Sequence, residues 1–97
     1  MTMAILVAGR QYDFIRFRSF IYNGRKYTIF IEPGKYDEHH IPVCYNFKHV
    51  EENIFEVPSA EEQHTLNEFV SSLITDCYLY GHDYIKELSI TLLPFGE

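Results

Sequence analysis

The residue types best suited to chemistry lie together in the run Asp37-Glu38-His39-His40. Carboxylates and imidazoles are ligands for transition metals, so one hypothesis is a metal-dependent enzyme that uses His39 and His40. Neighbouring positions rarely converge on one ion, however, and His49, His64 and His82 lie singly along the chain. We therefore interpret this run as a solvated loop and predict neither a metal nor another cofactor.

The cysteines and the paired glutamates are the other candidates for chemistry. Cys44 and Cys77 lie far apart, and no base or orienting group can be named for either of them. We expect two free thiols in a reducing, cytoplasmic compartment. Glu51-Glu52 is typical of a turn, Glu61-Glu62 is typical of a helix start, and no phosphate-binding glycine motif is present. The sequence thus predicts no catalytic residue, and we expect a protein that is not an enzyme.

The charge is distributed unevenly along the chain, which has a net charge of −6. Residues 1–31 hold five basic residues and one carboxylate, a net +4, whereas residues 32–97 hold three and thirteen, a net −10. The basic, aromatic segment from Tyr12 to Lys26 raises the question of nucleic-acid binding. Because the molecule as a whole repels a phosphate backbone, we do not favour direct binding of nucleic acid.

The strand signals begin with Asn23-Gly24, which favours a type I′ turn and pairs Tyr22 with Arg25 and Phe20 with Tyr27. The hydrophobic alternation is irregular on both sides of this turn. Either a β-bulge near Ile15 or coverage of both sheet faces would explain the irregularity. We expect Pro33-Gly34 to end the second strand and Lys35 to His40 to form a loop.

Alternation from Ile41 to Phe47 predicts a third strand, and Ile54 to Val57 predicts its returning partner in a second hairpin. Ala4 to Ala8 and Leu88 to Leu92 predict the first and last strands.

A capping box at Ser59-Ala60-Glu61-Glu62 predicts a helix from about Ala60 to about Tyr80, with Gly81 as its end. Its apolar stripe consists of Leu66, Phe69, Val70, Leu73, Ile74 and Cys77. We predict a single α+β domain over residues 1–97: a mostly antiparallel sheet of about five to six strands, with one long helix packed on one face. No apolar run approaches the length of a membrane span.

Three segments carry a resemblance to a known family: Tyr27-Thr28-Ile29-Phe30-Ile31-Glu32-Pro33, Val50-Glu51-Glu52 and Ile54-Phe55-Glu56-Val57-Pro58. Together with the acidic helix start, they resemble a bacterial family of small acidic domains of unknown function over roughly residues 12–74. The Arg-rich first strand and the final strand depart from that family, and the resemblance implies no activity or site residue. In size and in its Tyr-rich, acidic character, the chain also resembles small acidic phage-encoded inhibitors, including anti-CRISPR proteins.

We expect a small acidic protein–protein interaction module, such as a phage or mobile-element inhibitor, that binds a positively charged, nucleic-acid-handling protein. The residues that we expect to contact this partner are Glu61, Glu68, Asp76, Tyr36 and Tyr84. One alternative is a cytoplasmic domain that acts as a homodimer or other homo-oligomer, since the basic and acidic halves are complementary. The other is the metal-dependent enzyme with His39 and His40.

Overall fold

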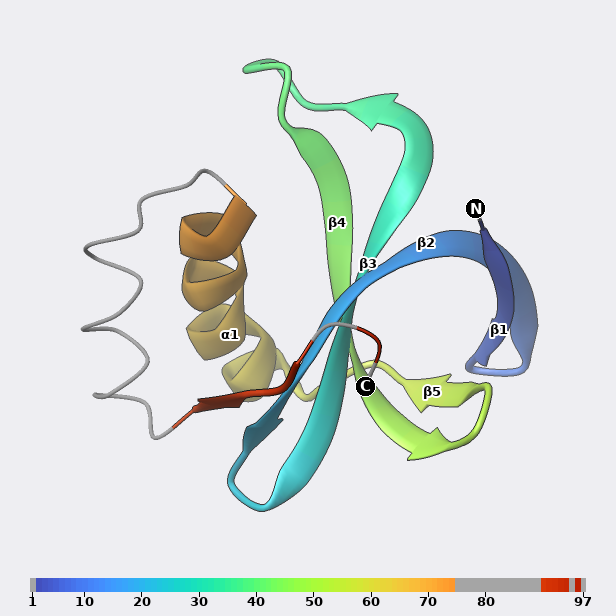
Figure 1. Ribbon diagram of the computed structural model, residues 1–97, viewed down its shortest axis with the longest axis vertical. Coiled ribbons are helices and arrows are strands. Elements are labelled where there is room, and N and C mark those ends of the chain that lie inside the picture. Colours follow the sequence, from blue (N-terminus) through green and yellow to red (C-terminus); the bar gives the residue numbers. More distant parts are fainter. Residues whose placement is uncertain (1, 75–89, 95, 97) are drawn as a thin grey trace.

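The computed structural model describes residues 2–74, 90–94 and 96, and this part of the chain is built mostly from β-strands. Figure 1 shows a strongly twisted β-barrel with a helix on one side. The elements are β1 (Met3–Val7), β2 (Arg10–Tyr22), β3 (Arg25–Tyr36), β4 (Pro42–Glu51), β5 (Ile54–Glu56), α1 (Ala60–Ile74) and β6 (Thr91–Leu92).

Strands β1 to β5 close into a ring, which the sequence pattern did not predict. Strands β1 to β5 follow one another as antiparallel neighbours, and β5 then pairs with β1 in parallel, with Leu6 opposite Ile54. In an up-and-down arrangement of five strands the first and last run in the same direction, so the closing pair has to be parallel. β6 pairs with β2 outside the ring. The structure is therefore a five-stranded mixed barrel with one outer strand and a helix. The predicted five to six strands, mostly antiparallel and with a helix packed against them, are present, but the closed barrel and its parallel closing pair were not predicted.

The first hairpin has the predicted turn and register. Asn23 and Gly24 both have positive φ, 52° and 72°, and Tyr22 lies opposite Arg25 while Phe20 lies opposite Tyr27. The register shifts between Arg16 and Arg18, so a bulge lies close to the predicted position. The second explanation for the irregular alternation also holds, because β3 is covered on both faces.

The strand that follows the first turn is longer than the sequence predicted. β3 does not end at Pro33-Gly34 but continues to Tyr36, which pairs with Pro42. The regular ladder is interrupted between Ile31 and Tyr36, so Pro33 needs no N–H there, and Gly34 takes a positive φ of 75°. Pro33 and Gly34 therefore interrupt the pairing within the β3–β4 hairpin but do not end β3. We call the outer part of this hairpin, formed by the end of β3, the start of β4 and the loop between them, the projecting arm.

Two apolar clusters lie on opposite faces of β3. The barrel cluster fills the inside of the ring and consists of Ile5, Val7, Phe14, Phe30, Phe47 and Phe55. The helix cluster lies between the barrel wall and α1 and consists of Phe20, Tyr27, Ile29, Leu66, Phe69, Val70 and Ile90. Because β3 contributes buried residues to both clusters, it is the central element of the fold.

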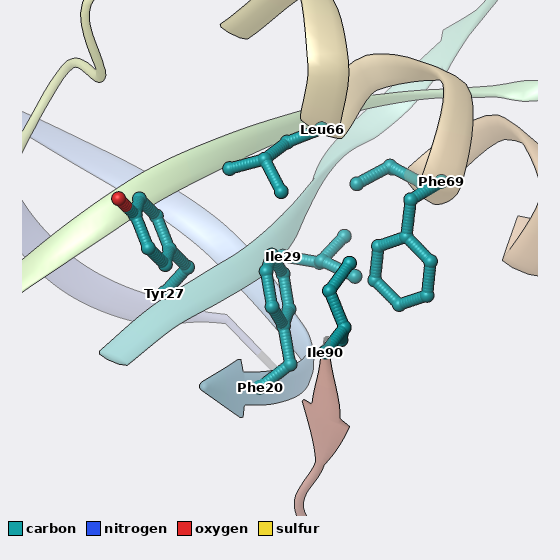
Figure 2. Close-up of a cluster of buried hydrophobic side chains, with 7 residues drawn as sticks. Phe20, Tyr27, Ile29, Leu66, Phe69 and Ile90 are labelled. Carbon is teal, nitrogen blue, oxygen red and sulfur yellow. The ribbon is translucent and has the colours of Figure 1, made fainter. Parts of the chain in front are cut away.

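The helix docks through the predicted stripe. Leu66, Phe69 and Val70 are buried, and Figure 2 shows Leu66 and Phe69 reaching from α1 toward Phe20 and Ile29. The rings of Phe69 and Phe20 meet edge to face with their centroids 5.1 Å apart.

Other parts of the helix prediction lie outside what the structure describes. These are the side chains of Leu73 and Ile74, Cys77, and the extension of the helix to Tyr80 with its end at Gly81. Of the predicted last strand, Leu88 to Leu92, the structure confirms Thr91–Leu92 as β6, while Ile90 belongs to the helix cluster and Leu88 and Ser89 lie outside the described residues.

Candidate binding surface

A hollow of about 370 Å³ opens at the barrel wall, next to the turn between β1 and β2. It is lined by Val7, Ala8, Arg10, Tyr12, Phe14, Glu32, Tyr45, Phe47, Val57 and Gln63. β2 contributes every second residue from Arg10 to Phe14, because alternate side chains of a strand point to the same face. We call this hollow the aromatic pocket.

Four rings form one wall of the aromatic pocket. Tyr12 stacks on Phe14 with ring centroids 5.3 Å apart, Phe14 stacks on Tyr45 at 5.3 Å, and Tyr45 stacks on Phe47 at 5.8 Å. The two phenylalanines are buried, whereas the two tyrosines are half-buried and keep part of their surface open to a ligand. The wall is therefore a preformed apolar surface with two accessible rings.

A fixed carboxylate lies at the edge of these rings. The hydroxyl of Tyr45 donates to Oε1 of Glu32 at 2.6 Å, and Nζ of Lys35 lies 2.8 Å from Oε2. These two donors, Lys35 first, hold the pKa of Glu32 below its ordinary value. The same bond, together with burial, raises the pKa of Tyr45. Glu32 is thus an oriented anion in the aromatic pocket.

The segment from the end of β4 to α1 is rich in exposed carboxylates. Residues 49–70 contain six carboxylates and no Lys or Arg, and Glu51, Glu52, Glu56, Glu61 and Glu68 are exposed. We call these five exposed glutamates the acidic face. They come from the end of β4, the turn after it, β5 and α1.

Exposed apolar side chains accompany the acidic face. Leu6 and Ile54 lie opposite each other on β1 and β5, and Val50 and Val57 flank β5 in the chain. All four are at least 40% exposed. They lie near Glu51, Glu52 and Glu56 in sequence and register, so this region is both apolar and acidic. Exposed apolar patches rimmed by polar residues mark sites that bind other proteins.

Glu62, the half-buried carboxylate of residues 49–70, makes contacts inside the fold. Its backbone N–H donates to Oγ of Ser59 at 3.2 Å, which confirms this half of the predicted capping box. Its carboxylate was expected to reach the N–H of Ser59 but accepts instead from the hydroxyls of Ser59 and Tyr27. Nζ of Lys48 lies 3.7 Å from Oε1. Glu62 therefore ties α1 to β3 and β4.

The predicted partner-binding residues do not all lie together. Glu61 and Glu68 are exposed on α1, as the position of the apolar stripe indicated. Tyr36 is 63% exposed but lies at the far end of β3, on the projecting arm (Figure 1). Asp76 and Tyr84 lie outside the described residues.

The structure gives the Asp37-Glu38-His39-His40 run a local role. The carboxylate of Asp37 accepts hydrogen bonds from the backbone N–H groups of His39 and Ile41, at 2.8 and 3.0 Å, and so closes the tip of the arm. These bonds lower the pKa of Asp37. In the part of the chain that the structure describes, no group of three or more His, Cys, Asp or Glu could hold a metal ion.

Cys44 is half-buried and packs against the helix cluster. Burial raises the pKa of its thiol, which reduces the fraction of reactive thiolate at neutral pH. Cys44 is therefore best described as a packing residue.

Sequence reasoning missed the aromatic pocket, although part of its signal was visible. Arg10, Tyr12 and Phe14 alternate along one strand, and Tyr45 and Phe47 alternate along another. What the sequence could not show is that these two strands, separated by β3, face each other across the inside of a ring.

Comparisons with known proteins do not add to this picture: no family model, no curated protein and no solved structure matches the chain. The described residues contain no helix that is long and apolar enough to cross a membrane.

Proposed function

We propose that this protein is a non-catalytic binding module whose acidic face engages a positively charged protein, in particular one that handles nucleic acid. The observation that carries the proposal is the run of exposed carboxylates and exposed apolar side chains along residues 50–68, from the end of β4 through β5 into α1, with Leu6 opposite Ile54. Carboxylates on such a face can pair with the Lys and Arg side chains that normally contact phosphates. The exposed valine, leucine and isoleucine side chains supply the apolar contact area that charge alone does not provide.

Binding of this protein to the phosphate-binding surface of the partner would by itself inhibit the partner. A surface evolved to bind phosphates carries a positive field, and an acidic protein is drawn to it by long-range attraction. Once bound, the acidic face would exclude the nucleic acid from the same groove. This is how a phage or mobile-element inhibitor of this size could act without any catalytic step.

The closed barrel weakens the case for the homodimer that we considered as an alternative. In the described residues, β1 to β5 all have neighbours on both sides, so these strands offer little free edge for pairing with a second copy. We therefore favour binding to a different protein.

The test uses affinity capture from the native host, followed by a titration of the purified partner. The variant Glu52→Lys/Glu61→Lys reverses two charges on the acidic face. The control Asp13→Lys/Glu38→Lys makes the same change in net charge, but at β2 and at the arm tip. We expect the first variant to lose about tenfold or more in affinity and the control to lose much less. Equal losses for both variants, or binding that is insensitive to salt, would contradict the proposal.

A further inference from the structure

We propose that the aromatic pocket receives one arginine side chain of the basic partner, in the position beside Glu32 that Lys35 now occupies. This inference rests on the proposed function and adds a specific residue contact to it. Its basis is the combination, in one preformed hollow, of accessible tyrosine rings and an oriented carboxylate.

The tyrosine rings favour a flat cation. A guanidinium group stacks on aromatic faces, whereas the ammonium group of lysine is a compact and strongly hydrated charge. Tyr12 and Tyr45 are the half-buried members of the stacked wall, so their surfaces remain available for this contact. The methylene stem of the arginine would lie against the apolar lining from Val7 and Val57.

The carboxylate of Glu32 favours a donor group that can give two parallel hydrogen bonds, as a guanidinium can. Tyr45 occupies one lone pair of Oε1 of Glu32, and Lys35 contacts Oε2. A carboxylate has about four acceptor positions, so an arginine could donate to both oxygens while the bond from Tyr45 stays in place. A lysine has only a single point of charge to offer.

Lys35 is easily displaced. Its side chain is 66% exposed, and ion pairs between exposed groups contribute little to stability. Lys35 also shows that this position accepts a cation, since the chain itself places one there. Arg10 also lines the pocket, so its positive charge opposes an incoming arginine, and the carboxylate of Glu32 has to offset that repulsion.

The pocket borders the acidic face. Val57, which lines it, directly follows Glu56, and Gln63, which also lines it, lies in the first turns of α1, two positions after Glu61. A basic segment that crosses the acidic face therefore passes the mouth of the pocket. A nucleobase could also stack on these rings, but its phosphates would meet the acidic face.

The experiment measures fluorescence anisotropy with three labelled peptides that alternate serine with arginine, lysine or citrulline. The parent protein should bind the arginine peptide about tenfold tighter than the lysine peptide, because only the arginine can both stack and donate two bonds. The citrulline peptide, which keeps the planar shape without the charge, should bind most weakly.

Four pocket variants and one control sharpen the result. Tyr12→Ala and Glu32→Gln should each bring the arginine peptide to the affinity of the lysine peptide, whereas Tyr12→Phe should keep the preference because it keeps the ring. Lys35→Ala should tighten binding of the arginine peptide by about threefold, since it removes the internal competitor. Arg25→Ala, at the opposite hairpin, removes the same charge and should tighten binding less. Circular dichroism spectra and thermal midpoints identify any variant that fails to fold.

The outcomes separate this inference from the proposed function. If Glu52→Lys/Glu61→Lys weakens binding but Tyr12→Ala and Glu32→Gln bind both peptides as the parent does, the pocket inference is wrong and the proposed function stands. If neither basic peptide binds and capture from the host returns no basic protein, the proposed function is wrong as well. If single-stranded oligouridine binds more tightly than the arginine peptide and depends on Tyr12, the occupant is a nucleobase and the inference is overturned.

Discussion

The same three residue types, tyrosine, glutamate and lysine, meet at two places in this protein. On the helix side, the hydroxyl of Tyr27 donates to Glu62, with Lys48 nearby. On the pocket side, the hydroxyl of Tyr45 donates to Glu32, which is also paired with Lys35. The first group lies between a strand and the helix, and the second lies at the edge of the aromatic pocket.

The two groups differ in the burial of the tyrosine and of the lysine, whereas the two carboxylates are similarly exposed, Glu62 at 27% and Glu32 at 20%. Tyr27 is fully buried in the helix cluster and Lys48 is 18% exposed, whereas Tyr45 is only half-buried and Lys35 is 66% exposed. Burial raises the pKa of Tyr27 far above its ordinary value, with the bond to Glu62 as the second cause. Hydrogen bonds to charged groups are worth more where water is excluded. The same three residue types therefore hold α1 against the barrel on the helix side. On the pocket side, the exposed Lys35 leaves the carboxylate of Glu32 available for the exchange of cations that we propose.

The largest expected effect comes from removing the packing on the helix side. Phe69→Ala should lower the free energy of unfolding by about 3–5 kcal/mol, because Phe69 is fully buried and its loss leaves a cavity. Tyr12→Ala, in the pocket, should have a much smaller effect because Tyr12 is half-buried. Urea unfolding of both variants measures the difference. Similar losses would show that the pocket wall is as structural as the helix cluster.

The two tyrosine hydroxyls give a closer comparison. Tyr27→Phe should lower the free energy of unfolding by about 1–2 kcal/mol, because Glu62 loses a donor at the junction between helix and strand. Tyr45→Phe should have a smaller effect, since Tyr45 is only half-buried and Lys35, 2.8 Å from Glu32, still supplies that carboxylate with a donor. Chemical denaturation of the two single variants checks the order, and the reverse order would contradict our distinction between the two groups.

Lowering the pH should show how much the ionised side chain of Glu62 contributes to the free energy of unfolding. The hydroxyl of Tyr27, followed by Ser59, holds the pKa of Glu62 below its ordinary value of 4.5. Since the unfolded chain binds more protons near that pH, the stabilisation is present above about pH 4.5 and is lost as the pH falls through the folded-state pKa. The lowered pKa values of Glu32 and Asp37 act in the same direction.

Glu62→Gln should therefore be less stable than the parent near neutral pH, and the gap should narrow toward about pH 3. Thermal midpoints across this range measure the gap. A gap that widens on acidification would show that Glu62 is not stabilised in its ionised form.

The smallest expected effect concerns the acidic face itself. Glu61→Lys/Glu68→Lys should change the free energy of unfolding by no more than about 1 kcal/mol, because both side chains are exposed. Most of that change should come from Glu61, which lies in the first turn and favours the positive end of the helix dipole. A large loss of stability in this variant would mean that the acidic face has a structural role, and its use in binding would need a different probe.

The sequence by itself determined the local features of this protein. The Asn23-Gly24 turn and its register follow from the backbone freedom of two adjacent residues. The start of α1 at Ser59 and its buried face follow from one side-chain bond and from helical spacing. Each of these features depends on residues a few positions apart, so a linear pattern contains the information.

The closed barrel and the contacts inside it could not be predicted from the sequence and became visible in the tertiary structure. The pairing of Leu6 with Ile54 joins strands from different parts of the chain, and Phe14 meets Tyr45 only because that pairing bends the sheet into a barrel. Likewise, Glu62 looks like an ordinary capping residue until β3 brings Tyr27 to it. Such contacts depend on which distant segments of the chain pack against one another. Hydrophobic periodicity and turn chemistry describe only nearby residues, so they do not show which segments will meet.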